Sequence, residues 1–201
     1  MRTLRKTTQL TVAAAGLFAG VFLTPGAVAA SASAPEPFYW YRIIVAHSSQ
    51  CLDVAHVRLE SGAKVVQGHC GGVGSTTNQH WRVEYVNGSG GPVRIVARHS
   101  RKCLDVAGAS RAHAAGVIQA TCGGPAATSQ LWRVRYVKTV GSHHWYWIVN
   151  QNSGKCLDVA HGLINHGTRV VQGTCGGPGA GANQLWRRQT AAVTWPQSER
   201  G

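Results

Sequence analysis

The chain has 201 residues, and its 20 lysines and arginines outnumber its seven acidic residues to give a formal net charge of +13. Such a charge favours polyanionic partners, namely nucleic acid, anionic cell-wall polymers and acidic glycans, although it also simply keeps a secreted protein in solution. The basic residues are scattered singly rather than clustered, which excludes the usual sequence signature of a specific nucleic-acid-binding protein.

Residues 1–30 are predicted to be a secretory signal peptide. Three basic residues stand in the first six positions, an uncharged apolar stretch follows to about residue 23, and small residues offer cleavage after Ala29, Ala30 or Ala32. This stretch is too short to span a bilayer stably, and no later segment approaches 18 apolar residues. We therefore expect a soluble, exported, extracellular protein that begins with a short linker at 31–37 and carries 17 basic against seven acidic residues, a net charge of +10.

One five-residue sequence, Cys-Leu-Asp-Val-Ala, occurs three times. It begins at Cys51, Cys103 and Cys156, and each copy is followed 19 residues later by a second cysteine. An apolar pair and a glutamine precede each second cysteine, Gly-Gly follows it, and Gln-x-Trp-Arg closes each unit at 79–82, 130–133 and 184–187. These matches predict three copies of one unit of about 52 residues, at roughly 38–84, 85–135 and 136–189, followed by a tail at 190–201.

The six cysteines are predicted to pair within the repeats. Six cysteines allow 15 connectivities, but the constant spacing favours one bridge in each unit, and an exported protein meets an oxidising compartment. A metal site is the alternative, but there is no close Cys-x-x-Cys pair and the ten histidines keep no common ligand spacing, so we expect neither metal nor cofactor. The predicted bridges are Cys51–Cys70, Cys103–Cys122 and Cys156–Cys175.

The sequence predicts an all-β fold. Short segments rich in valine and isoleucine, such as those at 43–45, 95–96 and 148–149, are bounded by glycine, serine and asparagine, and residues 87–92 form a turn sequence. No apolar period of 3.6 residues lasts long enough for a substantial helix. One repeat of a few strands is too small to bury its own core, so we expect three repeats to share one core around a common axis.

The threefold combination of CLDV, a VVQ-x-x-C type segment and Gln-x-Trp resembles the ricin-type (R-type) lectin domain. The resemblance covers roughly Phe38–Gln189. It implies a β-trefoil of twelve strands with pseudo-threefold symmetry, in which the cysteine pair bridges within each lobe. It also implies that the tryptophans of the Gln-x-Trp motifs pack in the core, namely Trp81, Trp132 and Trp186.

The resemblance also implies one shallow sugar site in each lobe. In the family, the aspartate of CLDV accepts hydrogen bonds from sugar hydroxyls. An asparagine just before the Gln-x-Trp glutamine adds a polar contact, and the glutamine helps to orient it. An aromatic residue two positions before the second cysteine stacks on the sugar. A carboxylate can accept two vicinal hydroxyls through charge-assisted bonds, and the C–H face of a sugar suits an aromatic ring.

The match to this site differs among the repeats. Repeat two has Ser129 at the asparagine position and Gly108 where repeats one and three have a histidine after CLDVA. The stacking aromatic is missing in all three repeats, which have Gly68, Ala120 and Gly173 there. The predicted carbohydrate-binding residues are Asp53, Asn78, Gln79 and His56 in repeat one and Asp158, Asn183, Gln184 and His161 in repeat three, with Asp105 as a weaker site in repeat two.

Two interpretations of the chain remain open. The first is a secreted lectin-like protein that binds a glycan or polysaccharide. The second is a trefoil interaction protein, such as an inhibitor or accessory subunit, that binds a protein or an anionic polymer such as a cell-wall polymer; there the aspartates serve the scaffold by bonding nearby backbone. We do not expect an enzyme, because the sequence has no G-x-S-x-G, H-E-x-x-H or phosphate-loop motif and its three repeated acids stand in separate units.

Overall fold

The computed structural model describes residues 37–71, 77–176 and 181–194. The predicted signal peptide at 1–30, the linker up to residue 36 and the end of the predicted tail lie outside these residues. None of the helices in the described part is long and apolar enough to cross a membrane.

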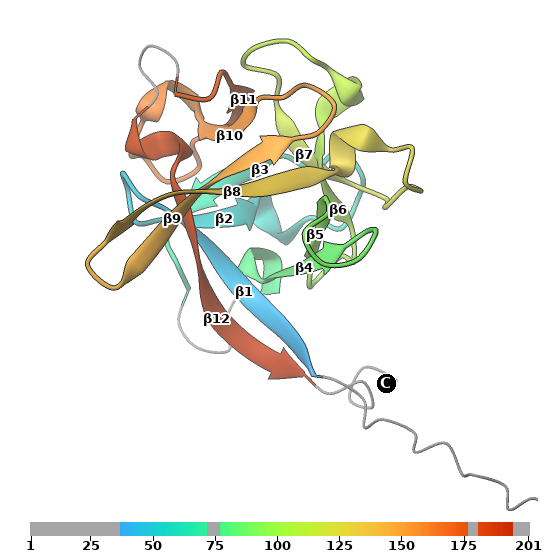
Figure 1. Ribbon diagram of the computed structural model, residues 1–201, viewed down its shortest axis with the longest axis horizontal. Helices are drawn as coiled ribbons and strands as arrows, with labels where there is room; N and C mark the ends of the chain where they lie inside the picture. Colours follow the sequence, from blue (N-terminus) through green and yellow to red (C-terminus); the bar gives the residue numbers. More distant parts are fainter. Residues whose placement is uncertain (1–36, 72–76, 177–180, 195–201) are drawn as a thin grey trace, which may run out of the picture. The chain divides into compact units, whose positions relative to one another are not determined.

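The described residues form twelve β-strands and six short 3-10 helices (Figure 1). Lobe one comprises β1–β4, lobe two β5–β8 and lobe three β9–β12. The strands are β1 (Phe38–Val45), β2 (Cys51–Val54), β3 (Val65–Gly68), β4 (Trp81–Tyr85), β5 (Val93–Ala97), β6 (Cys103–Val106), β7 (Val117–Ala120), β8 (Trp132–Val140), β9 (His143–Asn150), β10 (Cys156–Val159), β11 (Val170–Gly173) and β12 (Trp186–Thr194). The 3-10 helices are η1 (Ala55–Val57), η2 (Thr77–Gln79), η3 (Ala107–Ala109), η4 (Thr128–Gln130), η5 (Ala160–Gly162) and η6 (Ala182–Gln184).

The first and last strands of each lobe close into a six-stranded antiparallel barrel. Following the pairings around the ring gives β1, β4, β5, β8, β9, β12 and again β1. The short hairpins β2–β3, β6–β7 and β10–β11 hang from β1, β5 and β9, and isolated bridges join them to one another. This arrangement confirms the predicted all-β trefoil of three repeats. β12 runs to Thr194, beyond residue 189 where the predicted domain ends, because its last residues pair with the start of β1.

The three tryptophans of the Gln-x-Trp motifs anchor the core, as the family resemblance implies. Trp81, Trp132 and Trp186 are at most 1% exposed. Each indole Nε1 donates to the carbonyl of the leucine in its own lobe's CLDVA segment, at 2.9 to 3.0 Å. The bond matters because a buried indole N–H needs a partner. Each motif tryptophan therefore fixes the hairpin that carries its lobe's aspartate.

The predicted disulfides are confirmed. The structure contains Cys51–Cys70, Cys103–Cys122 and Cys156–Cys175, each with a sequence separation of 19. In every case the first cysteine is buried, whereas the second is exposed or, for Cys175, partly exposed. Closing a loop of this length stabilises the fold by about 3 kcal/mol in the chain-entropy model.

The glutamines before the second cysteines join neighbouring lobes. Gln172 of lobe three is fully buried. Its Nε2 donates to two carbonyl oxygens of lobe two, Ser110 O at 2.9 Å and Ala112 O at 2.8 Å. Its Oε1 accepts a bond from Ser153 Oγ at 2.6 Å. The equivalent glutamines of the other two lobes make the same three kinds of bond. Each lobe is therefore hydrogen-bonded through its glutamine to a loop of a neighbouring lobe. In these two cases Gln67 bonds Leu163, Asn165 and Ser48, and Gln119 bonds Arg58, Glu60 and Ser100.

One buried titratable group makes the stability of the fold depend on pH. His80 is 2% exposed, and its Nε2 has no partner among the described residues. Burial, together with the charges of Arg42 and Arg98, lowers the pKa of His80 from 6.5 to about 4. The imidazole is therefore neutral in the folded chain, and its contribution to stability is present above pH 6.5 and is lost as the pH falls to about 4.

We expect His80→Leu to remove this acid sensitivity. Leucine is the matched choice because lobes two and three have Leu131 and Leu185 at the same position. Urea unfolding at neutral pH and at the acid end of this window would show a clear loss of stability in the wild type and a smaller one in the variant. Equal losses in the two proteins would show that His80 does not cause the acid sensitivity.

Candidate functional site

Each lobe brings together the aspartate of its CLDVA segment and the glutamine of its Gln-x-Trp motif. The aspartates are the third residues of β2, β6 and β10, and the glutamines end the short helices η2, η4 and η6. The adjoining position on each helix holds Asn78, Ser129 or Asn183. Because the motif tryptophan that follows each helix is fixed to the CLDVA segment, residues about 25 positions apart meet at one point in each lobe.

In lobes one and three both carboxylate oxygens are held by side-chain amides. Asn78 Nδ2 donates to Asp53 Oδ1 at 2.5 Å and Gln79 Nε2 donates to Asp53 Oδ2 at 2.7 Å. The bonds from Asn183 and Gln184 to Asp158 measure 2.6 and 2.7 Å. Asp53 and Asp158 are only 7% and 8% exposed, so the carboxylates are rigidly placed just below the surface.

Lobe two has an incomplete version of this arrangement. Gln130 Nε2 donates to Asp105 Oδ2 at 3.0 Å, but Ser129 is too short to replace the asparagine. The other oxygen, Asp105 Oδ1, is buried without a partner among the described residues. The carboxylate of the predicted weaker site in lobe two therefore accepts one side-chain amide bond, whereas those in lobes one and three each accept two.

The missing aromatic residue is linked to the position of the carboxylate. A Cβ atom at Gly68 would lie 2.5 Å from Asp53 Oδ2, and one at Gly173 would overlap Asp158 Oδ2. Glycine thus allows these aspartates to lie against the neighbouring strand. A tryptophan or tyrosine at either position is incompatible with the observed carboxylate geometry, and Ala120 stands there in lobe two, where the aspartate is less buried.

Burial raises the pKa of both Asp53 and Asp158 above the ordinary 3.8, although hydrogen bonds from the glutamine and asparagine of each set act in the opposite direction. A raised pKa means that each carboxyl group contributes stability below pH 3.8 and that this contribution is lost as the pH rises through the raised value. Ionising either carboxyl group therefore costs the fold some stability. Such costly buried charges are typical of functional sites.

An imidazole from another lobe lies at the site of lobe one. The ring of His166, in the loop of lobe three, stacks on His69 of lobe one with centroids 5.0 Å apart and planes 14° apart. The backbone N–H of His69 donates to His166 Nδ1 at 3.1 Å. His166 also acts electrostatically to lower the pKa of Asp53, and His113 of lobe two does the same for Asp158, in both cases against the larger effect of burial. At the equivalent place in lobe two lies Ser61 of lobe one, whose Oγ hydrogen-bonds with Thr121 Oγ1 at 3.1 Å.

The sequence contained a signal for these histidines. His113 and His166 each stand ten residues after the first cysteine of their repeat, where repeat one has Ser61. Our sequence analysis missed them because it assigned each site to a single repeat, whereas the loop that carries this position crosses to another lobe.

His56 and His161, also predicted as site residues, occupy a strained turn. Their φ angles are 58° and 56°, and Gly108 has φ 60° in lobe two. A left-handed conformation costs a non-glycine residue roughly 1 kcal/mol. Both side chains are exposed, and neither hydrogen-bonds to its lobe's carboxylate within the described ranges. They border the sites without being part of the bonded set.

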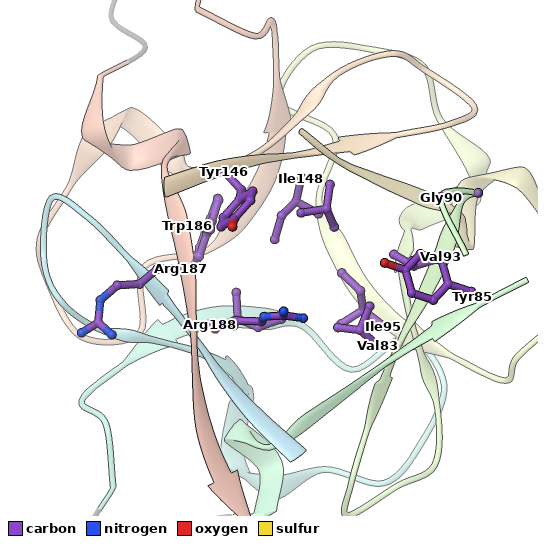
Figure 2. A pocket seen from close by; sticks show the side chains of 13 residues that line it. Val83, Tyr85, Gly90, Val93, Ile95, Tyr146, Ile148, Trp186, Arg187 and Arg188 are labelled. Carbon is purple, nitrogen blue, oxygen red and sulfur yellow. The ribbon is translucent and has the colours of Figure 1, made fainter. Parts of the chain in front are cut away.

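Besides the three aspartate sites, a metal site and a cavity are the other candidates for a functional site. The described residues contain no group of three histidine, cysteine or acidic side chains that could hold a metal. A cavity of about 260 Å³ opens at the end of the barrel, and the equivalent residues Ile43, Ile95 and Ile148 line it (Figure 2). Arg188 reaches into this cavity, whereas Arg187 points away from it (Figure 2). The cavity contains none of the predicted sugar-site residues.

Comparison with known proteins agrees with this architecture. The sequence matches the family described as ricin-type beta-trefoil lectin domain-like over residues 31–120, 77–173 and 128–195. The designed threefold-symmetric protein ThreeFoil is 36% identical, with a TM-score of 0.64 over 74% of this chain and 96% of that one. The C-terminal half of an earthworm R-type lectin, solved with GalNAc, has 16% identity and a TM-score of 0.56 over 76% and 98% of the two chains, and shares the fold.

A solved enzyme contains a similar domain. The exo-β-1,3-galactanase from Clostridium thermocellum is 26% identical, with a TM-score of 0.64, but the match covers 76% of this chain and only 30% of the enzyme. No curated protein matches the sequence.

Proposed function

Because the chain belongs to the ricin-type beta-trefoil lectin family, we propose that it is an exported carbohydrate-binding protein that recognises glycan hydroxyls at two sites, in lobes one and three. The observation that carries this proposal is the complete Asp–Asn–Gln set in those two lobes and its partial loss in lobe two.

The chemistry of each proposed site suits a sugar. Every carboxylate oxygen retains acceptor capacity after its bond to an amide, so Asp53 and Asp158 can each accept hydroxyl donors. The amide bonds hold each carboxylate in place, which reduces the entropy lost on binding. His166 brings a flat ring beside His69 at the site of lobe one, which lacks the family's stacking residue. The loop that carries His113 is held by Gln172 of lobe three.

Each site is expected to be weak by itself, with a dissociation constant near 1 mM or about −4 kcal/mol. Two sites on one molecule can bind a polymeric glycan together, and their combined retention then greatly exceeds that of either alone. We therefore propose a polysaccharide or a densely displayed glycan as the natural ligand, with an anionic cell-wall polymer as one such partner.

We further propose that the protein binds its glycan without hydrolysing it. The galactanase similarity covers less than a third of that enzyme, so it carries no argument for hydrolysis here. In the described part of the chain the three repeated carboxylates lie in separate lobes, each bonded to an amide, and so do not form the paired acids of a glycosidase. A trefoil that binds a protein remains the second candidate, favoured by the missing stacking residue.

The proposal is tested by making lobes one and three resemble lobe two. Asn78→Ser combined with Asn183→Ser removes one anchor from each carboxylate, and we expect retention on a panel of insoluble polysaccharides to fall about tenfold or more. Ser129→Asn is the matched control: it changes the same position in the other direction and should not reduce retention. Thermal melting would establish that all proteins are folded. Unchanged retention of the folded double variant would contradict the proposed sites.

A further inference from the structure

The β8–β9 hairpin places two tryptophans opposite two cations. Trp145 pairs with Lys138, and Trp147 pairs with Arg135 across the two strands. Directly opposite residues point to the same side of an antiparallel ladder, and residues two apart on a strand share a face. All four side chains therefore lie on one face of this hairpin, whose tip extends away from the barrel (Figure 1).

A β-bulge creates this arrangement. Arg135 and Lys138 are three residues apart, so they would point to opposite faces of a regular strand. The register shifts between Tyr136 and Lys138, and the extra residue returns Lys138 to the face of Arg135. The bulge therefore gathers the two cations beside the two indoles.

A third cation joins the same face from β12. The guanidinium of Arg187 lies 5.9 Å from the ring centre of Trp145, and Figure 2 shows its side chain directed away from the barrel cavity. We call Arg135, Lys138, Trp145, Trp147 and Arg187 the hairpin face. Arg135 and Lys138 are exposed, and the other three are partly exposed.

No acidic side chain of the described residues neutralises the hairpin face. Three of the described acids are the aspartates of the candidate sites, which are hydrogen-bonded within their own lobes, and the other two, Glu60 and Glu84, form ion pairs with Arg58 and Arg82. The face therefore presents three positive charges together with two partly exposed indoles.

The hairpin face is particular to lobe three. Trp145 stands three residues before Ile148, and the equivalent residues are Trp40 in lobe one and Pro92 in lobe two. Trp40 is fully buried and donates from Nε1 to Thr194 Oγ1 at 3.0 Å. Only Trp145 of these three positions combines an aromatic ring with exposure.

The hairpin face also adjoins the candidate site of lobe three. A Cβ atom at Gly176 would lie 3.5 Å from the Trp147 ring, so the ring is in contact range of this segment. The backbone N–H of Gly176 donates to Gln184 Oε1 at 3.1 Å, and Gln184 holds Asp158. A chain of sugars that occupies this site has the hairpin face beside it.

We propose that the hairpin face is a second glycan-binding surface, and that its ligand is an acidic polysaccharide. This inference deepens the proposed function and rests on it. Indoles pack against the C–H faces of pyranose rings, while arginine and lysine pair with the anionic groups of the polymer. Three cations around two partly exposed rings suit a polymer with one charge on every few sugars better than nucleic acid, whose charges are far denser.

The test removes the three charges of the hairpin face. In one variant Arg135→Gln, Lys138→Gln and Arg187→Gln are combined. The matched control combines Lys102→Gln, Arg111→Gln and Lys155→Gln, which lowers the net charge equally elsewhere on the protein. Retention is measured at physiological ionic strength on polygalacturonate, dextran sulfate, a phosphate-bearing wall polymer, a neutral polysaccharide and single-stranded DNA. The three acidic polymers distinguish carboxylate, sulfate and phosphate as the anionic group.

We expect the hairpin variant to lose about tenfold or more in retention on at least one acidic polysaccharide while keeping its retention on neutral polysaccharide. The control should lose much less. Trp145→Leu, which preserves apolar packing but removes the ring, should weaken the same interaction. Equal losses in the two charge variants would overturn the proposal, because they would indicate general charge attraction. Stronger retention on DNA than on every acidic polysaccharide would also overturn it.

These outcomes are distinguishable from failure of the lobe-one and lobe-three sites. The Asn78→Ser and Asn183→Ser variant should lose retention on neutral polysaccharide, whereas the hairpin variant should not. If neither variant loses retention on any polysaccharide, both proposals are wrong. If only the asparagine variant does, the hairpin face is not a glycan site.

Discussion

Asp158→Ala is expected to lower the free energy of unfolding by about 2 kcal/mol, whereas Asp105→Ala should change it by less than about 0.5 kcal/mol. In lobe three the carboxylate accepts bonds from both Asn183 and Gln184, and its removal leaves two buried amide groups short of an acceptor. The loss is partly offset because the variant no longer buries an ionised carboxylate, whose raised pKa already indicates a cost.

Asp105 differs because it makes only one such bond. Its Oδ1 is buried without a partner in the described part of the chain, and removing an unsatisfied acceptor recovers a desolvation cost. Urea unfolding of the wild type and the two variants, analysed with a common slope, would measure the difference. Equal destabilisation would mean that Asp105 and Asp158 contribute equally to the stability of the fold. The contrast between lobes would then give no support to two specialised sites.

The expected destabilisation limits what an aspartate variant can show about binding. Because Asp158→Ala both removes a proposed ligand contact and destabilises lobe three, a loss of binding in that variant does not separate the two roles. The asparagine variants avoid the difficulty, since Ser129 shows that serine at this position is compatible with the fold. Asp53 and Asp158 thus combine the amide hydrogen bonds that hold them within their lobes with the glycan contact that we propose.

The features that repeat at fixed offsets were predictable from sequence. The three disulfides follow from one cysteine spacing present three times, whereas the trefoil and the buried motif tryptophans follow from the resemblance of the repeat to the ricin-type lectin domain. The Asp–Asn–Gln sets could also be placed from the sequence, because the family resemblance implies them and all three members belong to one repeat.

Contacts between lobes were not predictable in this way. The loop with His166 belongs to repeat three but lies on lobe one, and repeat boundaries contain no information about which lobe a loop reaches. The hairpin face was hidden for a different reason. Without the bulge before Lys138, the alternation of the strand places its cations on opposite faces, and the sequence alone does not reveal where a bulge interrupts that alternation.

Gln172→Leu is expected to be among the most destabilising single polar substitutions in the fold, at about 3 kcal/mol or more. Leucine keeps most of the buried volume but leaves Ser110 O, Ala112 O and Ser153 Oγ without their present partner. Each buried polar group that loses its partner costs about 1–3 kcal/mol, less where it finds another partner or water.

The matched control for this prediction is Gln151→Leu, the same change at an exposed position, which should alter stability by less than about 0.5 kcal/mol. Urea unfolding of both variants tests the stability difference. A cost below about 1 kcal/mol for Gln172→Leu would show that the buried glutamines are not the main ties between lobes.

The same substitution also connects the fold to the proposed binding sites. The loop that Gln172 holds carries His113, which acts electrostatically to lower the pKa of Asp158 of lobe three. If this loop must be held in place for the imidazole to reach the site, retention on polysaccharide should fall in Gln172→Leu under conditions where the variant is still folded, and His113→Ala should reproduce the fall without the loss of stability. Full retention in both variants would place the neighbouring lobe's histidine outside the site and leave the Asp–Asn–Gln set as the whole of it.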